Sequence, residues 1–150
     1  MDFISKDKRS KIMRSIKSRD TKPEIYLRKF LFSNGLRYKV AYKKLSGKPD
    51  IAFVSKKLAI FVHGCFWHQH KGCKRASIPK SNTEYWIPKL KKNINRLKEN
   101  LEELDNMGFT TAVIWECEVN KTLTYNKLVK KILTVTSKSC SNSYNPFSIY

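Results

Sequence analysis

A chain of 150 residues is the usual length of one domain, and a hydrophobic content of 41% is sufficient for a buried core. Its 31 Lys and Arg residues against 12 Asp and Glu give a formal net charge of +19, so the expected partner is a polyanion, with nucleic acid the first candidate. The sequence has no run of about 18 apolar residues and no signal peptide, so we expect a soluble cytoplasmic protein without a membrane partner.

The N-terminal part predicts a basic segment followed by a helix. Residues 5–18 carry many lysines and arginines and a thin apolar stripe, which fits either an arm lying on a polyanion or a solvated helix. Asp20 or Thr21 can cap the next helix, which should end at Asn34-Gly35. Three apolar or aromatic runs then predict strands, at residues 36–42, 50–54 and 58–62.

The second half of the chain predicts a loop, a long helix and one more strand. A loop should run from His63 to Pro79, and the longest helix should open at Asn82 or Thr83 and end at Gly108. An apolar stripe at spacings of four and three marks its buried face, at Leu90, Ile94, Leu97, Leu101 and Leu104. We expect a strand at 109–115, an amphipathic helix at 123–136 and a loose polar tail at 137–150.

This order of elements describes one small α/β domain. We assign residues 1–18 to a basic N-terminal arm, 19–136 to the folded domain and 137–150 to the tail.

Cysteine and histidine cluster in the predicted loop. Cys65, His70 and Cys73 have the spacing C-x4-H-x2-C, which lets a loop wrap a tetrahedral ion, and closed structural zinc sites need four N or S ligands. Cys117, at the end of a predicted core strand, is the candidate fourth ligand and is favoured over Cys140 in the polar tail. In the alternative interpretation, Cys65 and Cys117 are small buried hydrophobic residues.

Two further histidines lie outside that ligand set. His63 and His68 should lie near the end of the 58–62 strand, beside Asp50 at the start of its neighbour. Hydrolysis of a phosphodiester needs a carboxylate that holds Mg²⁺ and a group that orients or deprotonates water, and Asp50 and His68 are candidates for these roles. Capping or other structural hydrogen bonds would explain the same residues.

Three large aromatic residues stand in polar or loop settings: Phe66, Trp67 and Trp86. Such side chains can wedge between base pairs, where stacking recovers part of the cost of opening a step. The alternative is a small hydrophobic core under the loop.

Five motifs in one order resemble the very-short-patch-repair mismatch endonucleases, over a region from about Asp7 to Val119. They are Ser18–Glu24, Gly47–Ile51, Phe61–His68, Pro79–Trp86 and Val113–Cys117. The resemblance implies a restriction-endonuclease-like α/β fold, with a central mixed sheet flanked by helices and a structural zinc site. It also implies a nick made 5′ to the thymine of a T:G mismatch, the lesion left when 5-methylcytosine deaminates.

By the same resemblance, Asp50 and the main-chain carbonyl of Val62 hold Mg²⁺. His68 activates the water, His63 assists, and Glu24 lies close to the catalytic histidine. Zinc would be bound by Cys65, His70, Cys73 and Cys117. The DNA contacts fall on the aromatic wedge and the N-terminal arm, at Phe66, Trp67, Trp86, Met13, Arg14, Arg19 and Lys22.

The implied partners are double-stranded DNA containing a T:G mismatch and, functionally, a cytosine-5 DNA methyltransferase and a repair polymerase. The protein would act as a monomer at the bacterial nucleoid.

The chain departs from the family pattern at two places. Lys71 and Gly72 stand between the zinc-binding residues His70 and Cys73 where the family has one residue, and Gly72 can absorb the insertion by taking a positive φ. Leu97 stands where the family has an aspartate that belongs to a hydrogen-bonding network with the histidine matching His63. Leucine accepts no hydrogen bond, so we expect a weak or inactive nuclease with intact mismatch binding.

Two other functions therefore stay open at this point. A zinc-stabilised DNA-binding protein without catalysis would keep the arm, the aromatic residues and the zinc. A restriction-type nuclease that cuts both strands of undamaged DNA would share the fold but would usually need a dimer, and nothing in the sequence suggests a dimer surface.

Overall fold

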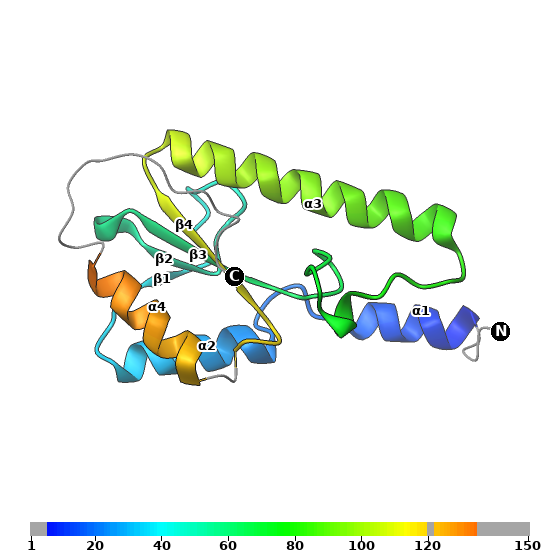
Figure 1. The fold of residues 1–150 in the computed structure, drawn as a ribbon, viewed down its shortest axis with the longest axis horizontal. Helices are drawn as coiled ribbons and strands as arrows, with labels where there is room; N and C mark the ends of the chain where they lie inside the picture. The colour runs from blue at the N-terminus through cyan, green and yellow to red at the C-terminus, as the bar shows by residue number, and fades with distance from the viewer. Residues whose placement is uncertain (1–5, 120–121, 135–150) are drawn as a thin grey trace.

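The computed structural model describes residues 6–119 and 122–134, which form a three-layer α/β domain (Figure 1). A four-stranded sheet in the order β1-β2-β3-β4 forms the middle layer, and its strands span Lys39–Val40, Ile51–Phe53, Leu58–His63 and Thr110–Trp115. The β1/β2 and β2/β3 pairs are antiparallel, whereas β3 and β4 are parallel. The predicted mixed sheet flanked by helices is therefore confirmed.

Helices cover both faces of this sheet. Helices α2 (Lys22–Ser33) and α4 (Thr122–Thr134) pack on one face and α3 (Thr83–Asn106) on the other. Alternation along β3 explains the two layers, because Leu58 and Ile60 enter the core with α2 and α4 while Ala59 and Phe61 enter the core with α3. The two central strands, β2 and β3, are thus buried on both faces.

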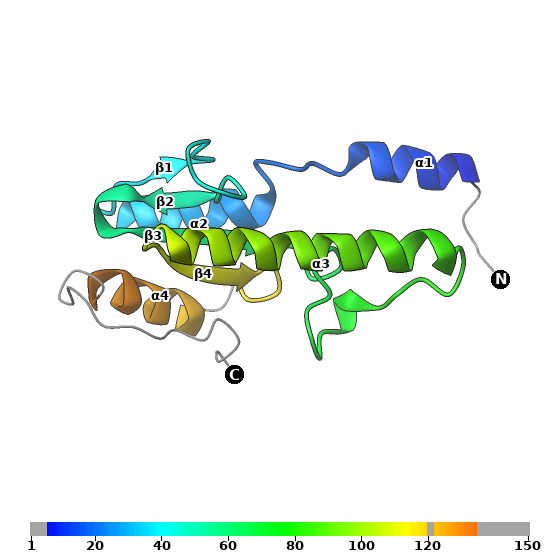
Figure 2. The ribbon, with the colours of Figure 1, turned by 90° about the horizontal axis from the view of Figure 1, so that it is seen from above.

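Helix α3 connects β3 to the parallel strand β4 and extends well beyond the sheet. Its C-terminal part packs through Leu104 into the core, whereas its first half projects away from the strands. Helix α1 (Lys6–Ser15) projects to the same side of the molecule, as the views from the front and from above agree (Figure 2). The predicted basic arm therefore contains a regular helix that stands out from the body.

The structure corrects three boundaries in the sheet. The strand expected at 36–42 shrinks to Lys39–Val40, because Ala41 turns into the left-handed region at φ 45° and ends the pairing with β2. The run 50–54 gives β2 at Ile51–Phe53, and a 3-10 turn follows at Val54–Lys56. His63, expected in the loop, is the last residue of β3.

Later boundaries differ by smaller amounts. Gly108, at φ 75°, separates α3 from β4, which begins at Thr110 rather than 109. The expected stripe of α3 is wrong at Ile94, which is 41% exposed, whereas its other four members are buried or half-buried. The final helix was expected at 123–136 and is described as Thr122–Thr134; the predicted tail, with Cys140, lies outside the described residues. Among the described helices, none has the length and apolar character needed to cross a membrane.

Candidate metal centre and active site

The loop after β3 and the end of β4 bring three cysteines and one histidine together. One ligand atom from each of Cys65, His70, Cys73 and Cys117 falls in a group whose members all lie within 4.8 Å of one another. The Sγ atoms of Cys65 and Cys117 lie 3.5 and 3.4 Å from Nδ1 of His70. The predicted constellation therefore exists as a compact Cys3His group.

These distances suit a tetrahedral ion. Metal–sulfur bonds of about 2.3 Å around such an ion separate neighbouring ligands by roughly 3.5–4 Å. Three sulfurs and one imidazole nitrogen form a soft donor set of the kind that zinc prefers. Burial raises the pKa of the Cys65 thiol to about 12, so Cys65 becomes a thiolate only beside a positive charge. The group can therefore bind a metal such as zinc.

Backbone hydrogen bonds and one aromatic contact shape the metal loop. The N–H of His70 donates to the carbonyl of Cys65 at 3.0 Å, and the N–H of Cys73 donates to the carbonyl of His70 at 3.1 Å. Gly72 has φ 75°, the conformation expected to absorb the extra residue before Cys73. The imidazole of His70 stacks on Trp115 with ring centroids 4.1 Å apart, which fixes its orientation.

Glu116 ties this loop to the sheet. Its Oε1 accepts the N–H of Cys65 at 3.1 Å, and its own N–H donates to the carbonyl of His63 at 2.9 Å. The residue between Trp115 and Cys117 therefore fastens the start of the metal loop to the end of β4.

Asp50 lies immediately before β2 and reaches across to β3. Its Oδ2 accepts the backbone N–H of Val62 at 2.7 Å. Burial raises the pKa of Asp50 to about 6; the Val62 N–H acts in the opposite direction, and the nearby Glu24 carboxylate raises the pKa further. Two carboxylates thus share a poorly solvated region, a situation that a bound cation relieves.

His63 and His68 form a stacked pair beside this region. Their ring centroids are 3.9 Å apart at an interplanar angle of 12°. Burial lowers the pKa of His63 to about 3, with His68 adding to the effect, and burial together with the charge of Arg96 lowers the pKa of His68 to about 4. Both imidazoles are therefore neutral near pH 7, the form that accepts a proton.

Each histidine of the pair has a buried ring nitrogen that lacks a hydrogen-bond partner among the described residues. Within the described part of the chain, neither Nδ1 of His63 nor Nδ1 of His68 meets a hydrogen-bond partner. Leu97, half-buried in α3, offers none. A buried polar atom in this state calls for an explanation.

Glu24 is buried at the start of α2, with 3% exposure. Its carboxylate accepts hydrogen bonds from the Asp20 N–H at 2.9 Å, the Thr21 hydroxyl at 2.8 Å and the Arg28 guanidinium at 3.0 Å. Among the described residues, no histidine donates to it. The structure thus gives Glu24 three partners around the helix start, and the expected nearness to the catalytic histidine stays a prediction.

The structure brings the three candidate wedge residues into one aromatic cluster. Phe66 contacts Trp67 and Trp86 with ring centroids 5.1 and 5.4 Å apart, and Trp67 lies 6.1 Å from Trp86. Trp86 was expected in a polar or loop setting, but it lies in α3 and is 4% exposed. The Lys89 ammonium lies 5.7 Å from the Trp67 ring centroid and donates to the Tyr85 hydroxyl. The aromatic cluster is therefore buried at Trp86 and lies beside a positive charge at Trp67.

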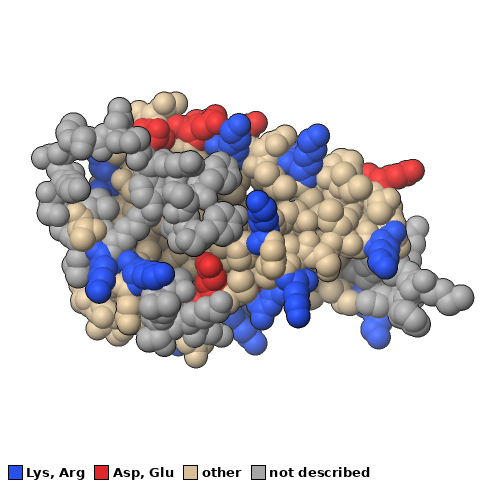
Figure 3. Space-filling model, in the orientation of Figure 1, with Lys and Arg blue, Asp and Glu red and all other residues tan. Residues whose placement is uncertain are grey.

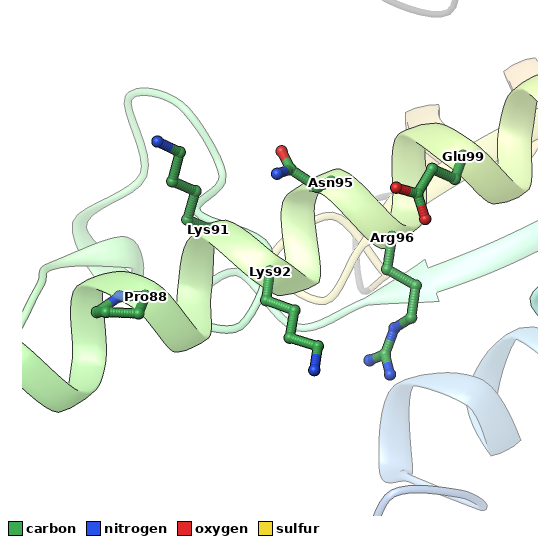
Figure 4. A pocket seen from close by; sticks show the side chains of 6 residues that line it. All are labelled: Pro88, Lys91, Lys92, Asn95, Arg96 and Glu99. Carbon is green, nitrogen blue, oxygen red and sulfur yellow. The ribbon is translucent and has the colours of Figure 1, made fainter.

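The first half of α3 adds a basic surface that the sequence alone did not identify. A groove of about 450 Å³ is lined by Pro88, Lys91, Lys92, Asn95, Arg96 and Glu99. Lys92 and Arg96 extend to the same side of the helix (Figure 4). On the face shown in Figure 3, acidic side chains gather over the C-terminal part of α3, and Lys and Arg side chains are spread over the rest of the described surface with few acidic neighbours. The projecting half of the helix is therefore the basic half.

The predicted arm residues are accessible. Met13, Arg14, Arg19 and Lys22 are all exposed, the first two in α1 and the others at or near the start of α2. Arg19 lies 3.9 Å from Asp20, a surface ion pair with little energetic weight. These side chains are free to meet a large polyanion.

Three residues contribute to the site without having been predicted: Arg28, Trp115 and Glu116. Trp115 and Glu116 adjoin the predicted ligand Cys117, so the Trp-Glu-Cys motif was a usable signal. Arg28 gave no signal, because its contact with Asp20 requires that residue's left-handed backbone, φ 54°.

Comparison with known proteins gives a consistent result. The family model described as DNA mismatch endonuclease Vsr matches residues 1–75. A type II nicking enzyme of Neisseria meningitidis serogroup A is 45% identical over 135 residues, which cover 87% of this chain and 96% of that enzyme. A type II nicking enzyme of Xanthomonas oryzae is 41% identical over 119 residues, covering 79% and 87%.

The DNA mismatch endonuclease Vsr of Escherichia coli K12 is 38% identical over 116 residues, covering 77% of this chain and 74% of that protein. Together with the mixed sheet, the Cys3His group and the Asp50 site, these matches show that the chain belongs to the Vsr family of DNA mismatch endonucleases, with a restriction-endonuclease-like α/β fold and the activity of a DNA-nicking nuclease.

Proposed function

We propose that this endonuclease nicks one DNA strand 5′ to the thymine of a T:G mismatch, in the repair of deaminated 5-methylcytosine. The proposal rests on the position of Asp50 beside the end of β3. Asp50 accepts the N–H of Val62, and the next residue, His63, ends the strand and stacks on His68. A carboxylate and a neutral imidazole at one strand end are the two groups that metal-assisted phosphodiester hydrolysis requires.

Asp50 and the main-chain carbonyl of Val62 would hold Mg²⁺. The carboxylate keeps acceptor capacity beyond its bond from the Val62 N–H, and its oxygens are ligands of the hard type that Mg²⁺ takes. In an extended strand the N–H and C=O of one residue point to the same edge, so the Val62 carbonyl faces the side of Asp50. When bound, Mg²⁺ would neutralise charge that develops on the phosphate.

His68 would accept the proton of the attacking water. Its depressed pKa leaves the imidazole neutral near pH 7, the form that a general base must have before it takes a proton. His63, stacked 3.9 Å away, limits how His68 can turn and so assists in its placement.

The Cys3His group would hold a structural zinc ion. It joins the loop that carries His68 to Cys117 at the end of β4, and Glu116 makes a second connection through the Cys65 N–H. Zinc in this position would brace the catalytic loop instead of reacting with the substrate.

The DNA would be held by three surfaces. The aromatic cluster of Phe66, Trp67 and Trp86 would open the duplex beside the mismatch, and the arm with Met13, Arg14, Arg19 and Lys22 would clamp the other side. Lys92 and Arg96 on α3 would contact phosphates between them.

A second candidate is a zinc-stabilised mismatch-binding protein with weak nuclease activity. The unsupported Nδ1 atoms of His63 and His68, together with Leu97 in the aspartate position, favour it. An imidazole whose second nitrogen lacks an acceptor is less well oriented and less basic.

In the cell, we propose that the protein works as a monomer in the cytoplasm, on DNA of the nucleoid. A cytosine-5 DNA methyltransferase would create the sites at which its substrate arises, and a repair polymerase would replace the nicked strand.

One assay separates these functions. Matched and T:G duplexes, labelled on each strand, are incubated with the protein and Mg²⁺ or EDTA. A Mg²⁺-dependent nick confined to the thymine strand supports the proposal, and binding without cleavage supports the second candidate. Equal cleavage of both strands in matched DNA would exclude both.

A further inference from the structure

We propose that Arg28 is a positioning residue of the active site, which holds the Glu24 carboxylate in place and ties the base of the N-terminal arm to the region of Asp50. The inference rests on the proposed role of Asp50. Arg28 itself would touch neither DNA nor a reacting atom.

Arg28 bridges two carboxylates from different parts of the backbone. One guanidinium nitrogen lies 2.6 Å from Oδ1 of Asp20, and the other lies 3.0 Å from Oε2 of Glu24. The side chains of Arg28 and Glu24 are 14% and 5% exposed, so their contact is screened less than an ordinary surface pair, whereas the Asp20 side chain is 55% exposed. A planar guanidinium can serve both carboxylates at once, which an ammonium cannot do with the same geometry.

The same contacts restrain the segment from which the arm departs. Asp20 has φ 54°, a strained conformation for a residue other than glycine, and its N–H donates to Oε2 of Glu24 at 2.9 Å. Thr21 donates to the other oxygen of Glu24 at 2.8 Å. Glu24 and Arg28 therefore fix the backbone immediately before α2, and with it the direction in which the chain continues back to α1.

Glu24 and Arg28 both act electrostatically on Asp50, in opposite directions. Glu24 is 3% exposed, and its negative charge raises the pKa of Asp50, whereas the positive charge of Arg28 lowers it. Without Arg28, the Glu24 carboxylate would lose its only cationic partner among the described residues and would be held by the Asp20 N–H and the Thr21 hydroxyl alone. The position of the arm and the electrostatic environment of Asp50 thus depend on one guanidinium.

The backbone of Arg28 is restrained as well. Its carbonyl accepts the Tyr38 hydroxyl at 2.6 Å, which connects this turn of α2 to the segment leading into β1. The backbone from which the Arg28 side chain extends is therefore held in place.

The test compares Arg28→Met and Arg28→Lys with Lys29→Met, a matched control at the neighbouring exposed position, all in the zinc-loaded full chain. At saturating T:G duplex, Arg28→Met should nick at least about tenfold more slowly, the scale of outer-shell partners of metal ligands. Arg28→Lys should be intermediate, and Lys29→Met should match the parent. Binding of the duplex should change less than the nicking rate.

A double-mutant cycle distinguishes positioning from general stabilisation. If Arg28 acts through Glu24, adding Arg28→Met to Glu24→Gln should slow nicking by less than about twofold. Additive losses that follow the melting temperatures would overturn the proposal. Amide hydrogen exchange gives a readout independent of activity. The Asp20 N–H should exchange at least about tenfold faster in Arg28→Met than in the parent, and at the parental rate in Lys29→Met.

Nicking by the parent protein and exchange at Asp20 distinguish the role of Arg28 from the proposed function. Parent protein that nicks the T:G duplex, with Arg28→Met at the parental rate and unchanged exchange at Asp20, overturns the role of Arg28. Parent protein that nicks no duplex overturns the proposed function, while exchange at Asp20 still decides whether Arg28 holds the base of the arm.

Discussion

The backbone N–H of Val62 donates a 2.7 Å hydrogen bond to Oδ2 of Asp50, so β3 and the residue before β2 meet at a single carboxylate. Asparagine can accept the same hydrogen bond through its side-chain oxygen but carries no charge. Asp50 therefore offers a substitution that separates its structural role from its proposed catalytic role.

We expect Asp50→Asn and Asp50→Ala to reduce nicking to background, with zinc content and T:G binding unchanged. Gel assays, metal analysis and binding titrations measure the three quantities. Asp105→Asn, at an exposed position near the end of α3, is the control and should behave as the parent. Nicking retained in either Asp50 variant would show that another group holds the metal.

The cysteine assignments predict which thiols are needed for metal. Cys117→Ser should lose the single bound zinc and lower the melting temperature, because it opens the link between the metal loop and β4. Cys140→Ser should keep one zinc per chain. Metal analysis by mass spectrometry after extensive dialysis provides the measurement, and loss of zinc from the Cys140 variant instead would reverse the assignment.

Leu97 should limit the rate of cutting. In Leu97→Asp, a carboxylate in the middle of α3 could accept from the unsupported His63 nitrogen, and nicking should rise by about 10²-fold, the scale of a well-placed acid or base group. Ile94→Asp adds the same charge at an exposed position of the helix and should bring no gain. A fast parent that gains nothing from Leu97→Asp contradicts the idea.

The aromatic cluster should divide into a structural and a DNA-facing part. Trp86→Ala removes a side chain that is 4% exposed and should destabilise the fold by about 3 kcal/mol, measured by denaturant unfolding. Trp67→Ala should cost less stability, because this ring is half-buried, but should weaken discrimination between T:G and matched duplexes. Equal effects of both substitutions on discrimination and stability would contradict this division.

The sequence predicted best what is local. The Cys65, His70 and Cys73 spacing and the strand ending before Cys117 were sufficient to predict a group that the structure assembles. The central strands β2 and β3 were also found from their short apolar runs.

What the sequence did not predict depends on the placement of distant segments. The burial of Trp86 requires the first turn of α3 to lie over the metal loop, and the contact between Glu116 and the Cys65 N–H requires the parallel register of β3 and β4. The short β1 reflects the left-handed backbone of Ala41, which no local pattern reveals.

The two halves of helix α3 have different surroundings, because one packs on the sheet and the other projects beyond it. Its 24 residues, about 36 Å at 1.5 Å per residue, anchor in the core at Leu104 and carry Trp86 and Lys92 on the part outside the sheet. Substitutions in the outer half therefore leave the central core untouched. Exposed positions there, such as Lys92 and Arg96, can therefore change the proposed DNA contacts with little loss of stability, whereas the buried Trp86 cannot.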